Sequence, residues 1–419
     1  MKTKLKIFVS AYACEPGKGS EIGVGWHWAL EMSKFFELWV MTRANNQEPI
    51  EQYFAEHPDE DRGIHWVYYD CPNYIKQFKK QMRGVRTYYT LWQIFSDSVV
   101  KKTMEENQIK IFHLLTYGNA IWHVSNYGQK QFFVWGPTGG VDVIERDYSK
   151  HYTWKHRLIE LARRCVVASM RFNPGFHKRC KNADLILCKA NSTMKCIPEA
   201  YRPKALLFTD VAVEENAGEM VIPAQKEGKL VFLTVGKLDG WRGFDLILEA
   251  FPKVLEQMPD VELHIMGDGA ERTHIEHIVA TKNLEKNVFL LGQVPVDVYK
   301  EEMRTCDVVV NACLKEGAVT NAFDCMAYGK PLLCIDTGGY TRNFDDTCAI
   351  ILPRQNVRSQ MIAALADGMI RMLDYDTRAN FQKNMLTCGK KITWEIKGQQ
   401  IAETITEVYS RRRMKNNEE

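Results

Sequence analysis

The stretch LVFLTVGKLDGWRGFDLILEAF, residues 230–251, contains one complete strand–loop–helix unit. Its first six residues have the length and the apolar content of a buried strand. Gly236 then permits a tight turn, and apolar side chains recur at helical spacing from residue 244. We expect Asp245 to cap that helix. A strand, a glycine loop and a helix in this order are the building unit of a doubly wound parallel sheet.

The same unit recurs along most of the chain. The apolar runs of strand length are KIFVSA, ELWVMTR, IHWVYY, IKIFHLL, QFFVWG and ADLILC, followed by LVFLTVG, VELHIMG, NVFLLG, DVVVNA, PLLCID and CAIILP. Strands that alternate with helices imply right-handed crossovers and parallel sheets. We therefore predict an α/β protein with two Rossmann-like doubly wound domains that face each other across a cleft.

The domain boundaries follow from the break in this alternation. Residues 1–210 form the predicted N-terminal domain and residues 211–393 the C-terminal one, with a polar stretch at 213–229 as linker or loop. Residues 394–419 contain a predicted helix from Trp394 to Arg413. That helix either stays with the second domain or crosses back to the first.

Bulk composition narrows the class of protein. A chain of 419 residues, 45% hydrophobic and 26% charged, suits a soluble two-domain protein. A net charge of +3 argues against a strongly basic nucleic-acid binder. Twelve cysteines without a CxxC pair indicate reduced thiols in the cytoplasm rather than a zinc site. The apolar run near the N-terminus is short, which favours a buried strand over a signal peptide.

Two cations follow the first strand of the second half. Lys237 and Arg242 lie five residues apart in the loop between strand and helix. Open α/β sheets bind ligands at the carboxyl ends of their strands. There a lysine and a planar guanidinium can together clamp a diphosphate. The alternative is a pair of solvated loop cations.

A second charged loop opens the stretch EGAVTNAFDCMAYGKP, residues 316–331. Glu316 and Gly317 begin the loop, and Asp324 lies on a helix that we expect to start near Asn321. Free amides at a helix N-terminus form an anion cradle, and the two carboxylates can accept hydrogen bonds from hydroxyl groups. Paired carboxylates also serve glycoside hydrolysis, but that reaction would leave the cations and amides unexplained.

The N-terminal stretch AYACEPGKGSEIGVGWHW, residues 11–28, contains a glycine-rich loop. Its spacing misses the dinucleotide pattern GxGxxG, because Ile22 occupies the third glycine position, and the Walker pattern also fails. Strand, glycine loop and helix still follow in the order that lets a backbone approach an anion. A loop without a ligand is equally compatible with the residues.

Taken together, these motifs resemble those of the GT-B-fold glycosyltransferases of family 4, also called glycosyltransferase group 1. The resemblance spans nearly the whole chain and includes GKL…RGFDLILEAF, GDGAE…NVFLLGQV and EGAVTNAFDCMAYGKP. It implies transfer of a sugar, with retention of anomeric configuration, from a nucleotide donor to a hydroxyl acceptor. The donor would be UDP-, GDP- or ADP-linked, and the acceptor a glycan or a lipid-linked saccharide in surface polysaccharide assembly. It also implies no cofactor, no catalytic metal and no covalent intermediate.

The resemblance assigns roles to individual residues. Glu316 would contact donor-sugar hydroxyls, Asp324 would hold the ribose, and Lys237 and Arg242 would neutralise the diphosphate. The remaining donor contacts implied by the family are Gly17, Gly19, Gly236, Gly267, Leu291, Val294, Gly317, Ala318, Val319, Thr320 and Asn321.

Three positions depart from the family pattern. Asp324 stands where a glutamate is usual, and Lys237 stands where an arginine is usual. Many relatives place a histidine on the acceptor side, where this chain reads VWGPTGGVD, residues 134–142. Gly139, Gly140 and His113 are the acceptor-side candidates, although His113 is equally compatible with a core position.

Two stretches, residues 73–95 and 152–181, combine basic and aromatic residues. Such faces suit an anionic membrane surface or a polyprenyl-diphosphate acceptor; the alternative is an amphipathic helix with a solvated basic face. We expect a cytoplasmic enzyme, peripheral on the inner face of the membrane, with no nucleic-acid partner.

Two other functions remain open, a non-hydrolysing sugar-nucleotide epimerase and a non-catalytic GT-B binding subunit. The acidic triplet Asp59-Glu60-Asp61 and the pair His274 and His277 are read as surface groups rather than metal ligands.

Overall fold

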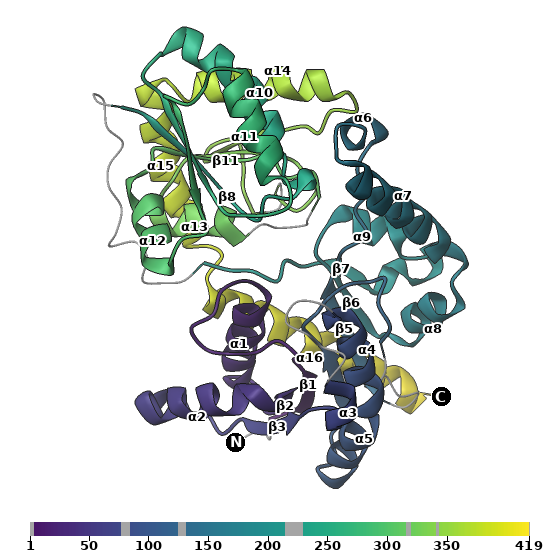
Figure 1. Ribbon diagram of the computed structural model, residues 1–419. Helices are drawn as coiled ribbons and strands as arrows, with labels where there is room; N and C mark the ends of the chain where they lie inside the picture. Colours follow the sequence, from purple (N-terminus) through teal and green to yellow (C-terminus); the bar gives the residue numbers. More distant parts are fainter. Residues whose placement is uncertain are drawn as a thin grey trace. The chain divides into compact units, whose positions relative to one another are not determined.

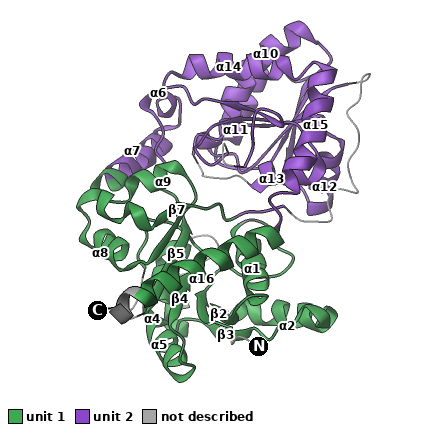
Figure 2. Ribbon diagram, turned by 180° about the vertical axis from the view of Figure 1, so that it is seen from behind, with its two compact units in different colours: residues 1–141, 166–210, 394–419 green, residues 142–165, 211–393 purple. Residues whose placement is uncertain are grey.

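The computed structural model describes residues 4–76, 84–124, 131–213, 229–315, 320–340 and 343–418. The chain forms two compact units, coloured separately in Figure 2. Unit 1 comprises residues 1–141, 166–210 and 394–419, and unit 2 comprises residues 142–165 and 211–393.

Unit 1 is built on a seven-stranded sheet in the order β3-β2-β1-β4-β5-β6-β7, and all its strand pairs are parallel. Near-continuous apolar side chains, such as Phe8, Phe112 and Phe133, are buried between the helices that cover it. The strands are β1 (Lys6–Ser10), β2 (Glu37–Arg43), β3 (His65–Tyr69), β4 (Ile111–Leu114), β5 (Phe132–Thr138), β6 (Leu185–Cys188) and β7 (Ala205–Leu207). The helices are α1 (Ser20–Ser33), α2 (Gln47–Glu56), α3 (Asn73–Lys76), α4 (Val85–Phe95), α5 (Asp97–Glu106), α8 (Pro174–Asn182), α9 (Asn191–Cys196) and α16 (Trp394–Glu418).

Unit 2 is built on a six-stranded parallel sheet in the order β10-β9-β8-β11-β12-β13. Helices α10, α11 and α14 pack together in one layer, and α12, α13 and α15 in another (Figure 1). The strands are β8 (Val231–Val235), β9 (Glu262–Met266), β10 (Val288–Gly292), β11 (Val308–Asn311), β12 (Leu332–Ile335) and β13 (Ala349–Leu352). The helices are α6 (Arg146–Ser149), α10 (Phe244–Gln257), α11 (Arg272–Thr281), α12 (Val296–Thr305), α13 (Thr320–Tyr328), α14 (Arg358–Arg371) and α15 (Tyr375–Gly389); α7 (Trp154–Ser169) runs across the boundary between the units.

The predicted α/β class and the doubly wound sheets are confirmed, and all twelve apolar runs form strands. In each sheet the strand order reverses direction beside the first strand, between β1 and β4 and between β8 and β11. Such switch points create the crevice where ligands bind in open α/β sheets. The short strand β7 was not predicted, because its three residues carry too little periodicity to be recognised.

Two local features differ from the sequence analysis. Residues 142–165, which we placed in the N-terminal domain, group with unit 2 because Ile144, Tyr148 and Tyr152 pack into the core of that unit. Asp245 does not cap α10, since Gly243 precedes the helix in a left-handed conformation and the Asp245 carboxylate accepts a hydrogen bond from Arg358 instead.

Helix α16 groups with unit 1 and packs against α1. Within the described ranges no helix combines the length and the apolarity that spanning a membrane requires.

Candidate functional site

The carboxyl ends of β8, β9 and β10 are joined by backbone hydrogen bonds. The Gly236 amide donates to the Met266 carbonyl oxygen at 3.0 Å, and the Gly267 amide donates to the Gly292 carbonyl oxygen at 2.7 Å. A Cβ atom on Gly267 would lie 1.9 Å from the Gly236 oxygen, and the φ of Gly267 is +133°. Only glycine fits there. Two predicted donor-binding residues, Gly236 and Gly267, are therefore in direct contact.

The side chain of Arg242 lies beside Gly236, one member of this glycine pair. Arg242 ends a short 3₁₀ turn, Gly240–Arg242, and a Cβ built on Gly236 would lie 3.6 Å from its Nε atom. Arg242 Nη1 donates to Cys313 Sγ at 3.4 Å, and its Cζ lies 4.2 Å from the centroid of the Trp241 ring. A cation is thus held at the switch point between β8 and β11.

Lys237 lies in the same loop as Arg242, but its side chain is exposed and has a surface ion pair. Its side chain is 68% exposed, and its Nζ lies 3.3 Å from Asp239 Oδ2. An exposed ion pair of this kind contributes about 0–1 kcal/mol, so little free energy opposes a shift of the ammonium toward a bound anion. The structure brings Lys237 and Arg242 to one loop, with Arg242 as the fixed member.

The amino end of α13 is tied to the same edge of the sheet. Asn321 Nδ2 donates to the Val235 carbonyl oxygen at 3.3 Å, and Asn321 Oδ1 accepts from Asn311 Nδ2 at 3.0 Å. The Asn321 side chain therefore positions the helix, while the backbone amides of the first turn, which starts at Thr320, have no partner inside the helix. That leaves backbone groups to act as the anion donors that the sequence predicts.

Asp324 lies one turn further along α13, where its Oδ2 accepts a hydrogen bond from the hydroxyl of Tyr299 on α12. Burial and the adjacent Asp324 carboxylate raise the pKa of Tyr299 well above its ordinary value, so Tyr299 stays a donor. The sequence analysis missed Tyr299, because nothing in the spacing of α12 marks it.

Leu291 and Val294 flank Gly292 and the end of β10, and both side chains are at least partly exposed. Their predicted place beside the nucleobase stays a prediction. Glu316, Gly317, Ala318 and Val319 lie outside the described residues.

Lys315, directly before that stretch, is buried and paired. Its Nζ lies 2.5 Å from Oε1 of Glu160 on α7, in a pair whose side chains are 11% and 7% exposed. The same Nζ lies 5.2 Å from the centroid of the Trp241 ring that also contacts Arg242. Glu160, another residue that the sequence analysis did not single out, is thus connected to the cation of the site.

In unit 1, Gly17 and Gly19 follow β1, and a Cβ built on either would meet no atom within 4 Å. By contrast, a Cβ on Gly23 would lie 2.1 Å from the Lys18 oxygen, and one on Gly25 would lie 2.0 Å from the Ala13 oxygen. The later glycines therefore allow α1 to pack against its own loop. The open space around Gly17 and Gly19 agrees with their predicted role without testing it.

A partly buried charge cluster connects α1 to the carboxyl ends of the neighbouring strands in unit 1. Glu21 Oε1 accepts from the Tyr117 amide at 2.7 Å, while Lys189 Nζ contacts Asp210 and lies 3.4 Å from Glu21 Oε2. Burial alone would lower the pKa of Lys189, but the carboxylates of Asp210 and Glu21 outweigh it and raise the pKa. Glu21 was overlooked in the sequence because it reads as an ordinary first-turn acid.

The acceptor-side candidates lie along β4 and after β5. The Gly139 amide donates to the Gly118 oxygen at 2.8 Å, and Gly140 has a φ of +76°. His113 is fully buried, with Nε2 2.7 Å from the Gly136 oxygen, and burial lowers its pKa to about 4. A neutral imidazole inside the sheet favours the core role over acceptor contact.

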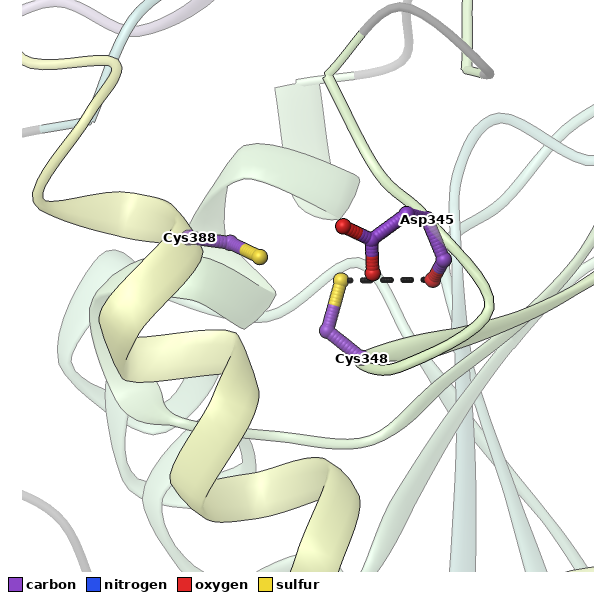
Figure 3. A group of neighbouring side chains, drawn as sticks. All are labelled: Asp345, Cys348 and Cys388. Carbon is purple, nitrogen blue, oxygen red and sulfur yellow. Dashed lines mark hydrogen bonds between the residues drawn. The ribbon is translucent and has the colours of Figure 1, made fainter.

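One group of candidate metal ligands converges within the described part of the chain: Asp345, Cys348 and Cys388 (Figure 3). The Cys348 thiol donates to the Asp345 backbone oxygen at 3.5 Å, and the Asp345 carboxylate accepts from the Thr347 amide at 2.9 Å. Burial raises the pKa of Cys348 to about 12, so the thiol keeps its proton. The group lies at the amino end of β13, whereas Arg242 follows the carboxyl end of β8, so the two lie at opposite ends of the parallel strands.

Comparisons with known proteins bear on the fold and on the family likeness of the chain. Residues 219–386 match the sequence profile of the family described as Glycosyl transferases group 1. The matched residues all lie within unit 2, and that unit therefore resembles a group 1 glycosyltransferase domain. The fold of the chain is that of the GT-B glycosyltransferases, since a glycosyltransferase from Rickettsia africae superposes with a TM-score of 0.61 at 13% identity, covering 97% of this chain and 99% of that one.

Further likenesses include one more solved structure and two curated proteins. The Anabaena protein Alr3699/HepE, crystallised with UDP and glucose, gives a TM-score of 0.54 at 14% identity over 96% of this chain and 99% of its own. The phosphatidylinositol N-acetylglucosaminyltransferase GPI3 subunit of Saccharomyces cerevisiae is 24% identical over 55% of this chain and 51% of its own length. A Campylobacter jejuni N-acetylgalactosamine-N,N'-diacetylbacillosaminyl-diphospho-undecaprenol 4-alpha-N-acetylgalactosaminyltransferase is 25% identical over 48% of this chain and 54% of its own. The chain thus spans about half the length of these curated relatives.

Proposed function

We propose that the protein transfers a sugar from a nucleotide-diphosphate donor to a hydroxyl group of a glycan or a lipid-linked saccharide. The observation that carries the proposal is the Arg242 guanidinium held beside Gly236, which itself contacts Gly267, at the switch point of unit 2. A diphosphate placed there meets a fixed planar cation, the long side chain of Lys237 and the first-turn amides of α13. The structure of the Anabaena protein with UDP and glucose supports this class of donor.

In the proposed reaction, the bond between the anomeric carbon and the diphosphate oxygen breaks as the acceptor hydroxyl attacks. Arg242 and Lys237 neutralise the charge that develops on the leaving diphosphate. Retention follows if the leaving diphosphate takes the proton from the incoming hydroxyl on the same face of the sugar. Protein cations and amides then replace a metal ion in this proposal. Asp324, oriented by Tyr299, accepts hydrogen bonds from the ribose.

We further propose a lipid-linked acceptor in surface polysaccharide assembly. The support is the undecaprenol-diphosphate substrate in the printed name of the Campylobacter jejuni relative.

Thermal shift with UDP, GDP, ADP and their sugars identifies the donor, because a ligand at 100 times its Kd stabilises the folded state by about 2.7 kcal/mol. Transfer to an undecaprenyl-diphosphate saccharide is then measured with EDTA present, for the wild type, Arg242→Ala and the matched control Arg304→Ala. Arg304 lies on α12 in an exposed pair with Glu301. The proposal expects an α-linked product from an α-linked donor, lost in Arg242→Ala only. A new sugar nucleotide formed without acceptor would establish the epimerase instead.

A further inference from the structure

Helix α7 exposes its large apolar side chains to solvent and buries an acidic one. Trp154 is 66% exposed, Leu158 55% and Ile159 58%, whereas Glu160 on the opposite face is only 5% exposed. The exposed large apolar side chains of this helix and the turn after it are Trp154, Leu158, Ile159, Leu161, Val166 and Phe172. A soluble protein ordinarily turns such a face toward its own core.

The polar face of α7 is anchored to unit 2 and fixes this orientation. Glu160 pairs with Lys315, and His156 Nδ1 lies 2.5 Å from Glu271 Oε1. Arg163 donates to the Asp142 carbonyl oxygen at 2.7 Å. Rotating the helix to bury its apolar face would strand a buried charge, which costs about 3–5 kcal/mol. The apolar face is therefore kept outward by the fold.

The charge around this face is of one sign. Residues 151–182 contain a single acidic residue, Glu160, and it is buried. Lys155 and Arg157 are exposed, and the Lys155 ammonium lies 5.7 Å from the centroid of the Trp154 ring. Arg171 lies over the ring of Phe172 at 4.5 Å. Exposed aromatic and aliphatic side chains bordered by cations match the boundary between anionic headgroups and acyl chains.

We propose that the outward face of α7 docks on an anionic lipid bilayer, with Trp154, Leu158 and Ile159 in the acyl boundary and Lys155 and Arg157 on the headgroups. A second copy of the chain fits less well, because a symmetric contact would oppose like charges. The alternative of a solvated basic face fits α7 less well, since Arg163 and Arg164 donate to backbone carbonyl oxygens. The proposal deepens the proposed function by naming its membrane partner, but docking requires no turnover.

The test is co-sedimentation with vesicles of phosphatidylcholine alone and of phosphatidylcholine with phosphatidylglycerol. We compare the wild type, Leu158→Glu/Ile159→Glu, and the control Phe35→Glu/Leu206→Glu, which changes two apolar side chains of lesser exposure in unit 1. We expect the wild type to prefer phosphatidylglycerol vesicles at least tenfold, and the α7 variant to lose at least tenfold in partitioning. The control keeps wild-type binding, and Lys155→Gln loses about fivefold.

Equal binding to both vesicles, no binding, or an α7 variant that binds like the control would overturn the proposal. A wild-type dimer in sedimentation equilibrium that the α7 variant abolishes would assign the face to a second copy. Melting temperature and nucleotide binding are measured on every variant. A chain that binds vesicles without binding nucleotide refutes the proposed function alone, and the reverse result refutes only this inference.

Discussion

Lys315→Met should be among the most damaging single changes in unit 2. The substitution leaves the carboxylate of Glu160, a residue only 5% exposed, without its cation, and Glu160 Oε2 already lacks a hydrogen-bond partner among the described residues. Removing one partner of a buried pair costs about 3–5 kcal/mol. For a unit of this size, 1 kcal/mol shifts the melting temperature by about 2–4 °C, so a fall of roughly 6–20 °C is expected.

Replacing both partners should recover most of the lost stability, because an apolar pair of similar volume leaves no unpaired buried charge. Calorimetry on Lys315→Met, Glu160→Leu and the double variant therefore completes a double-mutant cycle. Glu301→Gln is the matched control, since its pair with Arg304 is exposed and should contribute only about 0–1 kcal/mol. The reasoning fails if Lys315→Met is as mild as the control, or if the double variant is as unstable as the sum of the single ones.

Two more predictions concern the glycine contact and the buried histidine. Gly267→Ala should destabilise unit 2 by about 1–3 kcal/mol and weaken nucleotide binding, because its Cβ would lie 1.9 Å from the Gly236 oxygen. The control Gly19→Ala has open space around its Cβ and should keep the melting temperature of the wild type to within about a degree or two. Equal losses of stability in the two variants, measured by calorimetry, would show that the Gly236–Gly267 contact does not require glycine. His113 is held neutral with a pKa of about 4 against the ordinary 6.5, so the unfolded chain binds more protons between these values. Stability should fall by up to about 3 kcal/mol as pH drops through that window, and denaturant titrations of His113→Gln should lack this slope.

The strands were predictable because parallel strands buried on both faces must be apolar throughout their length. The glycine turn at Gly236 and the cations beside it were predictable because strand ends in such sheets are where ligands bind. Those inferences need only residues close together in the chain.

The supports of the site were not predictable from the sequence. Tyr299 on α12 donates a hydrogen bond to Asp324 on the neighbouring helix α13, and Glu160 pairs with Lys315, which lies 155 positions away in the sequence. Such pairings depend on how elements pack, which no local spacing records. The sequence likewise could not show which side chains of α7 face outward, because Arg163 and Arg164 meet backbone carbonyl oxygens only in the folded chain.

The most direct test of the central claim is calorimetric titration of UDP, GDP and ADP into the wild-type protein with EDTA present. The account predicts that at least one nucleoside diphosphate binds without metal. Arg242→Ala should weaken that binding by roughly tenfold or more, as loss of a charged hydrogen bond worth about 1.5–3 kcal/mol implies, while Arg304→Ala should bind like wild type. Absence of binding by all three nucleotides, or equal affinity in Arg242→Ala, would contradict a diphosphate seated on Arg242.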